Sequence, residues 1–378
     1  MEYKRLGDIA SYINGYAFKP SDRGIEGLPI IRIQDLTGNA YDTGYYNGSY
    51  PKEIEINDGD VLISWSASLG VYEWNRGKAL LNQHIFKVVF DKAEVNKNYF
   101  IFAIRNSLRT MTEKTHGATM KHITKRDFEE VRIPFPSLGD QDKIADILSA
   151  VEKIIEQRNH QLQTLDTLIK ARFVEMFGDL HYAPSGNWPL KKIGELADVT
   201  KLAGFEFTEH IHYQDSGDII MLRGLNCKHG KLDLTDVKYI DRETSEKLPR
   251  SKLHKGDILM TYAGTIGEVA MIDADEKYHL APNVGKVTIK NQDILNSDFL
   301  LHLFMYSHDY IMTFASQVAQ ASINMQKIRN FEYAIPPIDL QLEFSKFATQ
   351  VDKSKAAVQK SLDQTQVLMD SLMQQYFG

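Results

Sequence analysis

Two short polar stretches of the chain carry side chains suited to contacting nucleic acid. The first stretch is rich in basic groups: His116, Lys121, His122, Lys125 and Arg126. The second combines amides with bases: Gln320, Ser322, Asn324, Gln326, Lys327 and Arg329. Lysine and arginine can neutralise phosphates or bond guanine, whereas asparagine and glutamine can bond adenine through two atoms. We interpret both stretches as candidate DNA-contacting loops, with a charged helix N-terminus that faces water as the alternative.

A pair of turns built from small residues is the second candidate for binding. The sequence reads SWSASLG over residues 64–70 and TYAGTIG over residues 261–267. Glycine and small hydroxyl residues permit a close approach to a DNA backbone or base edge. We therefore predict DNA contacts from Ser64, Ser66 and Thr265. The aromatic residue in each turn could stack on a base, although packing into the core explains it equally well.

No motif of a catalytic or cofactor-binding centre is present in the sequence. It lacks the GxxxxGK loop for nucleotide phosphates, a GxGxxG turn between a strand and a helix, and HExxH or CxxC metal pairs. Residues 335–338 read IPPI and superficially resemble a loop of amino-methyltransferases, but Ile335 cannot accept a hydrogen bond from a target amine. The acidic residues Asp273, Asp275 and Glu276 are expected in a solvated loop. We predict that this chain holds no cofactor and no metal and is not an enzyme by itself.

The chain repeats its own landmarks in the same order. Its first half contains KRLGDIASYINGYAF from Lys4, which the second half answers with KKIGELADVTKLAGFEF from Lys191. DGDVLISWSASLG from Asp58 is likewise matched by KGDILMTYAGTIG from Lys255. A period of about 190 residues is too long for a solenoid repeat and indicates two copies of a whole domain. Strand-length β-branched runs followed by longer amphipathic stretches predict an α+β fold, with two similar domains of mixed strands and helices.

A long helix is predicted after each domain. The apolar seam of the first helix comprises Leu148, Val151, Ile155, Leu162, Leu165 and Ile169. The second helix has a weaker seam, which comprises Phe347, Val351, Val358, Leu368 and Leu372. Each amphipathic helix must bury its stripe, so we expect the two helices to pair antiparallel, with a homodimeric coiled coil as the alternative. We place the domains at residues 1–137 and 181–338, and the helices at residues 138–180 and 339–378.

The charge and cysteine content limit the kind of partner and compartment. Forty-four Lys and Arg against fifty Asp and Glu give a net charge of −6, so any DNA-binding surface must be a local basic patch. Cys227 is the only cysteine, which excludes an internal disulfide and suits a reducing compartment. No stretch approaches the ~20 apolar residues of a membrane span. We expect a soluble, cytoplasmic protein that does not associate with a membrane.

The doubled arrangement resembles the specificity subunit of type I restriction-modification enzymes across essentially the whole chain. The resemblance is carried by RLGDIA, GYAF, GDVLIS, GATMKHI and IPFPSLGDQDKIADIL, followed by a long helix and then by the second copy. It implies two target recognition domains separated by two long helices that form an antiparallel coiled coil. Each domain would read one half of a bipartite, asymmetric site in double-stranded DNA. The second helix start, IPPIDLQLEF, lacks the form seen in PSLGDQ, so we expect the two helix starts to dock partners differently.

The same resemblance implies the partners. The helices would dock two methylation subunits, which carry S-adenosylmethionine and the adenine-N6 methyltransferase activity. Restriction subunits, which use ATP and Mg, would add the endonuclease. Two alternatives from other classes are a self-contained restriction or methylation enzyme and a coiled-coil scaffold with two protein-binding domains.

Overall fold

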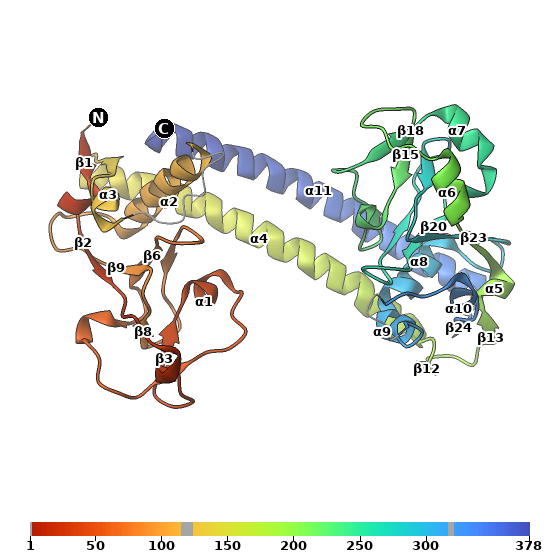
Figure 1. Ribbon diagram of the computed structural model, residues 1–378, viewed down its shortest axis with the longest axis horizontal. Coiled ribbons are helices and arrows are strands. Elements are labelled where there is room, and N and C mark those ends of the chain that lie inside the picture. Colours follow the sequence, from red (N-terminus) through yellow and green to blue (C-terminus); the bar gives the residue numbers. More distant parts are fainter. Residues whose placement is uncertain (1, 115–123, 317–320) are drawn as a thin grey trace. The chain divides into compact units, whose positions relative to one another are not determined.

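The computed structural model describes residues 2–114, 124–316 and 321–378. It divides into two compact units, which are shown in Figure 1. Unit 1 comprises Met1–His160 and Gln359–Gly378, and unit 2 comprises Gln161–Val358. Each unit therefore holds one strand-containing domain together with a segment of both long helices.

The domain of unit 1 is built from three small sheets. The first sheet has the order β2 (Ser11–Asn14), β9 (Ile85–Val89), β6 (Val61–Ser64), β7 (Gly70–Glu73) and is antiparallel throughout. The second has the order β4 (Tyr45–Tyr46), β3 (Leu28–Ile31), β8 (Ala79–Leu81), β5 (Glu55–Ile56), with β3 and β8 parallel. A third, two-stranded sheet pairs β1 (Tyr3–Arg5) with β10 (Arg132–Pro134). Helix α2 (Lys97–Lys114) packs against β7.

Unit 2 repeats this strand order. Its first sheet runs β14 (Ala197–Lys201), β23 (Val284–Ile289), β20 (Ile258–Thr261), β21 (Val269–Met271). Its second runs β18 (Lys238–Ile240), β15 (Ile219–Leu222), β22 (Tyr278–Leu280), β19 (Lys252–Leu253), and β15 and β22 are again parallel. Strand β13 (Leu190–Lys192) pairs with β24 (Glu332–Ala334), and helix α8 (Ser297–Tyr306) packs against β21. The predicted α+β repeat is thereby confirmed.

The two domains differ in the segments that follow the matched strands β3 and β15. Unit 1 continues from β3 into the short helix α1 (Ile33–Thr37). Unit 2 forms the shorter 3-10 turn η4 (Gly224–Asn226) at this place and then adds a hairpin of β16 (Cys227–Lys228) and β17 (Lys231–Leu232). Unit 2 also carries the short helices α6 (Gly204–His210) and α7 (Arg242–Lys247). One scaffold thus supports different surfaces in the two units.

Two helices of 40 residues each, α4 (Leu138–Phe177) and α11 (Ile338–Phe377), follow the two domains. In unit 1, Leu148 from early in α4 shares a core with Met373 from late in α11. In unit 2, Phe173 from late in α4 lies 5.1 Å, ring to ring, from Phe344 early in α11. The start of each helix therefore meets the end of the other, which confirms the antiparallel pairing.

Burial along the helices corrects one predicted seam residue. Four predicted residues are buried: Leu148, Val151, Ile169 and Val351. Six are half-buried: Ile155, Leu162, Leu165, Phe347, Val358 and Leu372. Leu368, however, is 49% exposed, while its neighbour Met369 is 8% exposed, so the prediction for Leu368 as a seam residue was wrong. An α-helix turns about 100° per residue, so a seam displaced by one position faces a different direction.

A buried glutamine fastens each long helix to its domain. In unit 1, Gln141 Oε1 accepts a hydrogen bond from Asn96 N at 3.0 Å, and its Nε2 donates to Pro136 O at 3.0 Å. In unit 2, Gln341 makes the same two bonds, with Asn296 N at 2.9 Å and Pro336 O at 2.7 Å. The glutamine is thus used alike at both helix starts, and the expectation that the two starts dock partners differently stays a prediction. The two starts are anchored alike.

Within the residue ranges that the structure describes, no helix is both long enough and apolar enough to cross a membrane.

Candidate nucleic-acid interface

In each unit, two turns are hydrogen-bonded to one another at one end of the first sheet. Trp65 N, in the β6–β7 turn, donates to His84 O at 3.1 Å, and Tyr262 N, in the β20–β21 turn, donates to Asn283 O at 3.0 Å. His84 and Asn283 both have left-handed backbones, with φ of 74° and 68°. Such a conformation is uncommon outside glycine and gives a tight turn. The paired turns place the predicted small-residue candidates on one local framework.

The hydroxyl groups at the start of these turns brace the backbone. Ser64 is fully buried, and its Oγ donates to Ser68 O at 2.5 Å. Thr261 is equally buried, and its Oγ1 accepts from Glu268 N at 3.0 Å. Ser66 is only 7% exposed. The Ser64 hydroxyl therefore shapes the turn, and neither Ser64 nor Ser66 exposes its side chain in this structure, so their contact with DNA stays a prediction.

Thr265 and the aromatic residues have different surroundings. Thr265 is exposed at the tip of its turn, as a DNA contact requires. The Trp65 ring stacks on Phe86, with centroids 5.6 Å apart, and its Nε1 donates to Asn14 Oδ1 at 3.2 Å, which supports the packing alternative. The Tyr262 ring is half-buried beneath the ammonium of Lys201, at 5.4 Å from the ring centroid.

The basic stretch of unit 1 leads into helix α3 (Lys125–Glu129). Thr124 caps this helix, accepting from Asp127 N at 3.2 Å. Lys125 remains 53% exposed while lying 3.7 Å from a carboxylate oxygen of Glu129, and Arg126 is exposed. Both predicted contacts are therefore accessible to DNA. His116 and the predicted contacts Lys121 and His122 lie outside the described residues.

The corresponding helix of unit 2 is α10 (Met325–Arg329). Asn324 caps it, accepting from Lys327 N at 2.9 Å, and the exposed Gln326 follows. Lys327 Nζ donates to Phe314 O at 2.7 Å, and Arg329 Nη2 donates to Val199 O at 2.5 Å. Lys327 and Arg329 thus anchor α10 to its own domain, which leaves Asn324 and Gln326 as the more accessible pair.

Unit 2 brings its two candidate segments together. Ile323 N, just before α10, donates to Tyr262 O at 2.8 Å, and Ala263 bridges Ser322 in antiparallel fashion. The turn that carries Thr265 is therefore a neighbour of the segment that carries Asn324. This proximity could not be predicted from the sequence, because about 60 residues separate the two segments. They are brought together by β pairing in the folded domain.

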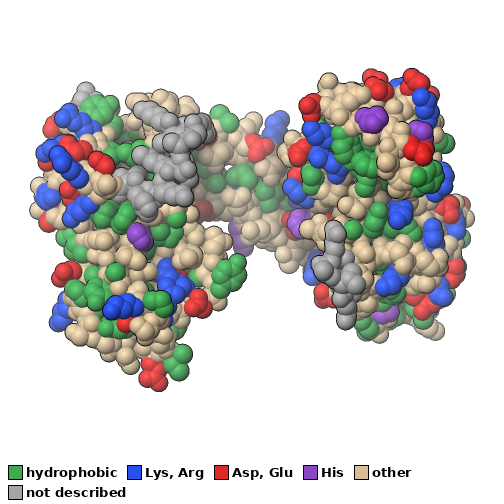
Figure 2. Space-filling view, viewed as in Figure 1, with side chains coloured by type: hydrophobic (Ala, Val, Ile, Leu, Met, Phe, Trp, Pro, Cys, Tyr) green, Lys and Arg blue, Asp and Glu red, His purple; other side chains and the backbone are tan. Residues whose placement is uncertain are grey.

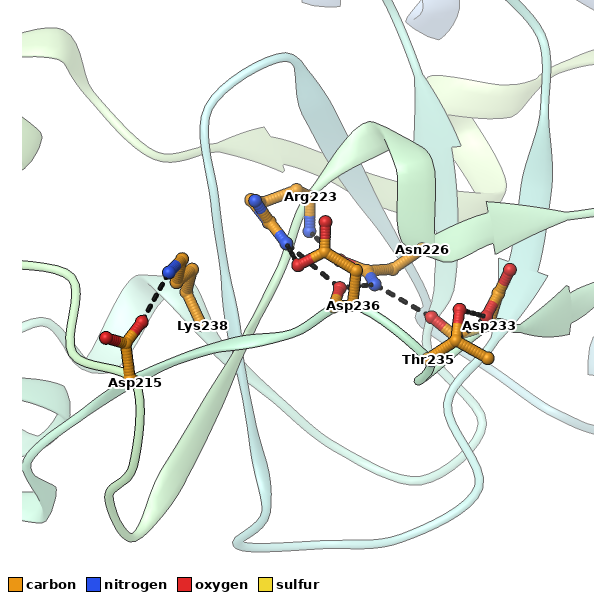
Figure 3. Close-up of polar contacts among 7 residues, drawn as sticks. All are labelled: Asp215, Arg223, Asn226, Asp233, Thr235, Asp236 and Lys238. Atoms are coloured by element: carbon orange, nitrogen blue, oxygen red, sulfur yellow. Dashed lines mark hydrogen bonds and ion pairs between the residues drawn. The ribbon is translucent and has the colours of Figure 1, made fainter. Parts of the chain in front are cut away.

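Sequence reasoning missed an arginine that follows each of the matched strands β3 and β15. Arg32 Nη2 lies 3.2 Å from Asp42 Oδ1, and Arg223 Nη2 lies 2.7 Å from Asp236 Oδ1. Asn226 supports the second pair: its Oδ1 accepts from Arg223 N at 2.9 Å, and its Nδ2 donates to Asp236 O at 2.8 Å (Figure 3). The signal was present in the sequence, because LPIIR and IIMLR both end in arginine.

Other groups singled out from the sequence have structural partners. Burial raises the pKa of the Cys227 thiol to about 12, so it remains protonated. Asp273 accepts from Tyr278 Oη at 2.8 Å, and Asp275 accepts from Lys255 N at 2.9 Å. Glu276 lies 3.3 Å from Arg242 Nη1. Across the described ranges, no three His, Cys, Asp or Glu side chains come together in a group that could hold a metal ion.

Two matched ranges decide the family. A model of the type I restriction modification DNA specificity domain matches residues 1–165 and 185–365, one range in each half of the repeat. The chain belongs to this family. The specificity subunit of the EcoBI type I restriction enzyme from Escherichia coli is 24% identical over 98% of this chain and 83% of its own length. The MjaVIII specificity subunit from Methanocaldococcus jannaschii is 23% identical over 98% of this chain and 91% of its own length.

Solved structures share the fold. The S subunit of a type I restriction-modification system from M. genitalium covers 100% of this chain and 96% of its own, with a TM-score of 0.57 at 14% identity. A chain from a structure of complex assembly and conformational transition in the type I system covers 99% and 97%, with a TM-score of 0.60 at 13% identity. The predicted resemblance is confirmed, and this specificity-subunit family is non-catalytic and serves DNA sequence specificity.

Proposed function

We propose that the chain reads a bipartite, asymmetric DNA site, with one half-site bound by each domain. The observation that carries this proposal is the repetition of one strand order with different side chains at equivalent places. Two domains with the same backbone fold can dock on duplex DNA in the same way. Different side chains at equivalent positions allow the two domains to recognise different base sequences. Basic and acidic side chains are interspersed on the visible face of both units, so local contacts rather than a broad positive field would give affinity (Figure 2).

The short helices α3 and α10 illustrate the difference. Thr124 and Asn324 cap them in the same way, each accepting from the backbone N–H three residues later. Two positions after the cap, unit 1 presents Arg126 and unit 2 presents Gln326, and both are exposed. Arginine bonds phosphate or guanine, whereas glutamine suits adenine. The same capped helix would therefore present a different DNA-contacting side chain in each unit.

The long helices offer apolar surface for docking methylation subunits. In unit 1, Ile147 and Ile154 lie on one face of α4 and are 43% and 42% exposed. In unit 2, Leu342 on α11 and Leu168 on α4 are 48% and 45% exposed. Large apolar side chains that remain exposed on a helix, such as the seven-residue-spaced pair on α4, are typical of surfaces that bind another protein. S-adenosylmethionine would be bound by these methylation subunits, and ATP with Mg by restriction subunits, so that this chain directs chemistry it does not perform.

The test is selection of bound duplexes by the chain assembled with its methylation subunit. From a random duplex library, we expect two defined blocks of bases separated by a spacer of fixed length and free sequence. A single continuous block, or no enrichment, would contradict the proposal. Ile154→Glu should also abolish co-purification of the methylation subunit, whereas Asn159→Glu, on another face of α4, should not. Family membership favours this function over a self-contained enzyme or a scaffold.

A further inference from the structure

A hollow of about 800 Å³ lies in unit 2 where three turns meet. We call it the three-turn hollow. The segment after β15 contributes Arg223, Lys228 and His229, the β20–β21 turn contributes Thr265 and Glu268, and the β22–β23 turn contributes Asn283. The hairpin β16–β17, which follows η4 and has no matching strand pair among the described residues of unit 1, forms part of its wall. The hollow therefore belongs to the part of the domain that distinguishes the two units.

The backbone around the hollow is held in unusual conformations. His229, Gly264 and Asn283 have φ of 48°, 81° and 68°. Two of these positions are fixed by hydrogen bonds, because His229 N donates to Glu268 Oε2 at 3.1 Å and Asn283 N donates to Tyr262 Oη at 3.2 Å. Non-glycine residues in this region of φ cluster at functional sites, where the surrounding structure maintains them.

The two basic side chains in the wall, Arg223 and Lys228, are each paired with a carboxylate of the same unit. Asp236 pairs with Arg223 at 2.7 Å, and Asp233 pairs with Lys228 at 2.5 Å (Figure 3 shows both aspartates). Glu268 adds a negative charge to the lining. A phosphate clamp needs uncompensated positive charge, so this lining is poorly suited to one. Mixed donors and acceptors beside apolar surface are what a base edge requires.

Three side chains are placed to supply those donors and acceptors. His229 is 88% exposed, and Asn283 and Thr265 are exposed at the tips of their turns. Among the residues that the structure describes, none bonds the side-chain amide of Asn283. Tyr213 and Leu225, which are 40% and 44% exposed, add apolar surface suited to a thymine methyl group.

We propose that the three-turn hollow reads base edges of one half-site, with Asn283, His229 and Thr265 as contacting residues and Arg223 as a positioning residue. Arg223 acts through Asp236 and Asn226, which hold the segment leading into the hairpin. This inference rests on the proposed function and names the residues through which the second domain carries it out. Unit 1, whose described residues form no such hairpin after α1, would read its half-site differently.

The test is sequencing of methylated sites in a methylation-deficient host that expresses each variant with its methylation subunit. Asn283→Ala and His229→Ala should relax base preference in one half of the two-part motif and leave the other half unchanged. Loss of a bidentate contact corresponds to about 5- to 150-fold less discrimination at one base pair. Lys238→Ala is the matched control, because Lys238 pairs with Asp215 in the same region and does not line the hollow.

The methylation patterns of the unmodified chain and of the variants distinguish failure of this inference from failure of the proposed function. If the unmodified chain gives a two-part motif and both variants retain it unchanged, the hollow does not read bases and the inference is wrong. Weaker methylation of all sites with unchanged base preference would also overturn it, in favour of phosphate contacts. If the unmodified chain gives no two-part motif, the proposed function itself fails. Asp236→Asn should alter the same base positions as Asn283→Ala, as expected if the arginine pair positions the hollow.

Discussion

Removal of the Gln341 side chain should destabilise unit 2 by about 3 kcal/mol. The side chain is fully buried and makes three hydrogen bonds, to Asn296 N at 2.9 Å, Ile294 O at 3.0 Å and Pro336 O at 2.7 Å. A buried hydrogen bond contributes roughly 1 kcal/mol net, and the groups left behind in Gln341→Ala have no water to replace their partner. The variant therefore loses an anchor between the helix start and the domain.

Hydrogen exchange followed residue by residue is the appropriate assay, because a chain of two units need not unfold in one step. A loss of about 3 kcal/mol raises the exchange rate of globally protected amides of unit 2 by roughly a hundredfold. The amide of Asn296, which loses its acceptor, should exchange fastest among its neighbours. Protected amides in unit 1 should keep their rates.

Two further variants decide whether the reasoning holds. Gln141→Ala removes two bonds of the same kind in unit 1 and should cost about 2 kcal/mol there. Gln350→Ala, at an exposed position of α11, should change stability by less than about 0.5 kcal/mol. If Gln341→Ala were as stable as Gln350→Ala, the buried glutamine would not anchor the helix.

Three other predictions concern the seam, the basic loop and the cysteine. Met369→Glu places a charge in the core of unit 1 and should lower the free energy of unfolding, measured in urea, by about 3 kcal/mol or more. Leu368→Glu should be nearly neutral because Leu368 is exposed. Equal effects of the two substitutions would contradict the assignment of Met369, rather than Leu368, to the helix seam. Lys125→Ala or Arg126→Ala should weaken DNA binding by the assembled complex. Each lost phosphate contact should also reduce the steepness of the plot of log affinity against log salt concentration by about one. Unchanged slopes would show that α3 does not contact DNA. A thiol reagent at pH 8 should label Cys227 slowly in the native protein and rapidly after unfolding, because burial raises its pKa to about 12 and lowers the thiolate fraction.

The repeat and the helix pairing could be predicted because they depend on periodicity. Strand-length runs and amphipathic stripes recur in both halves, and each must bury its apolar face. The register of the second seam could not be fixed this way, since Leu368 and Met369 are both apolar neighbours. Packing against α4 selects Met369, and the sequence contains no measure of that packing.

Site residues were harder to predict because exposure depends on tertiary contacts. Ser64 has the right chemistry for DNA, but its position at a strand end turns the hydroxyl to Ser68 O. Arg32 and Arg223 were missed because their aspartate partners follow at different distances, 10 and 13 residues later. The match between Gln141 and Gln341 could have been seen in the sequence, since each lies five residues after a proline. The residues between the proline and the glutamine differ in the two halves, however, and this difference hid the match.

Sequencing of methylated sites in a methylation-deficient host that expresses the unaltered chain with its methylation subunit tests the central claim most directly. We expect an asymmetric motif of two defined parts with an unspecified spacer, and a modified adenine on each strand. A continuous motif, a two-part motif with identical halves, or unmodified DNA despite a stable complex of the two subunits would contradict the account of two unlike domains on one chain.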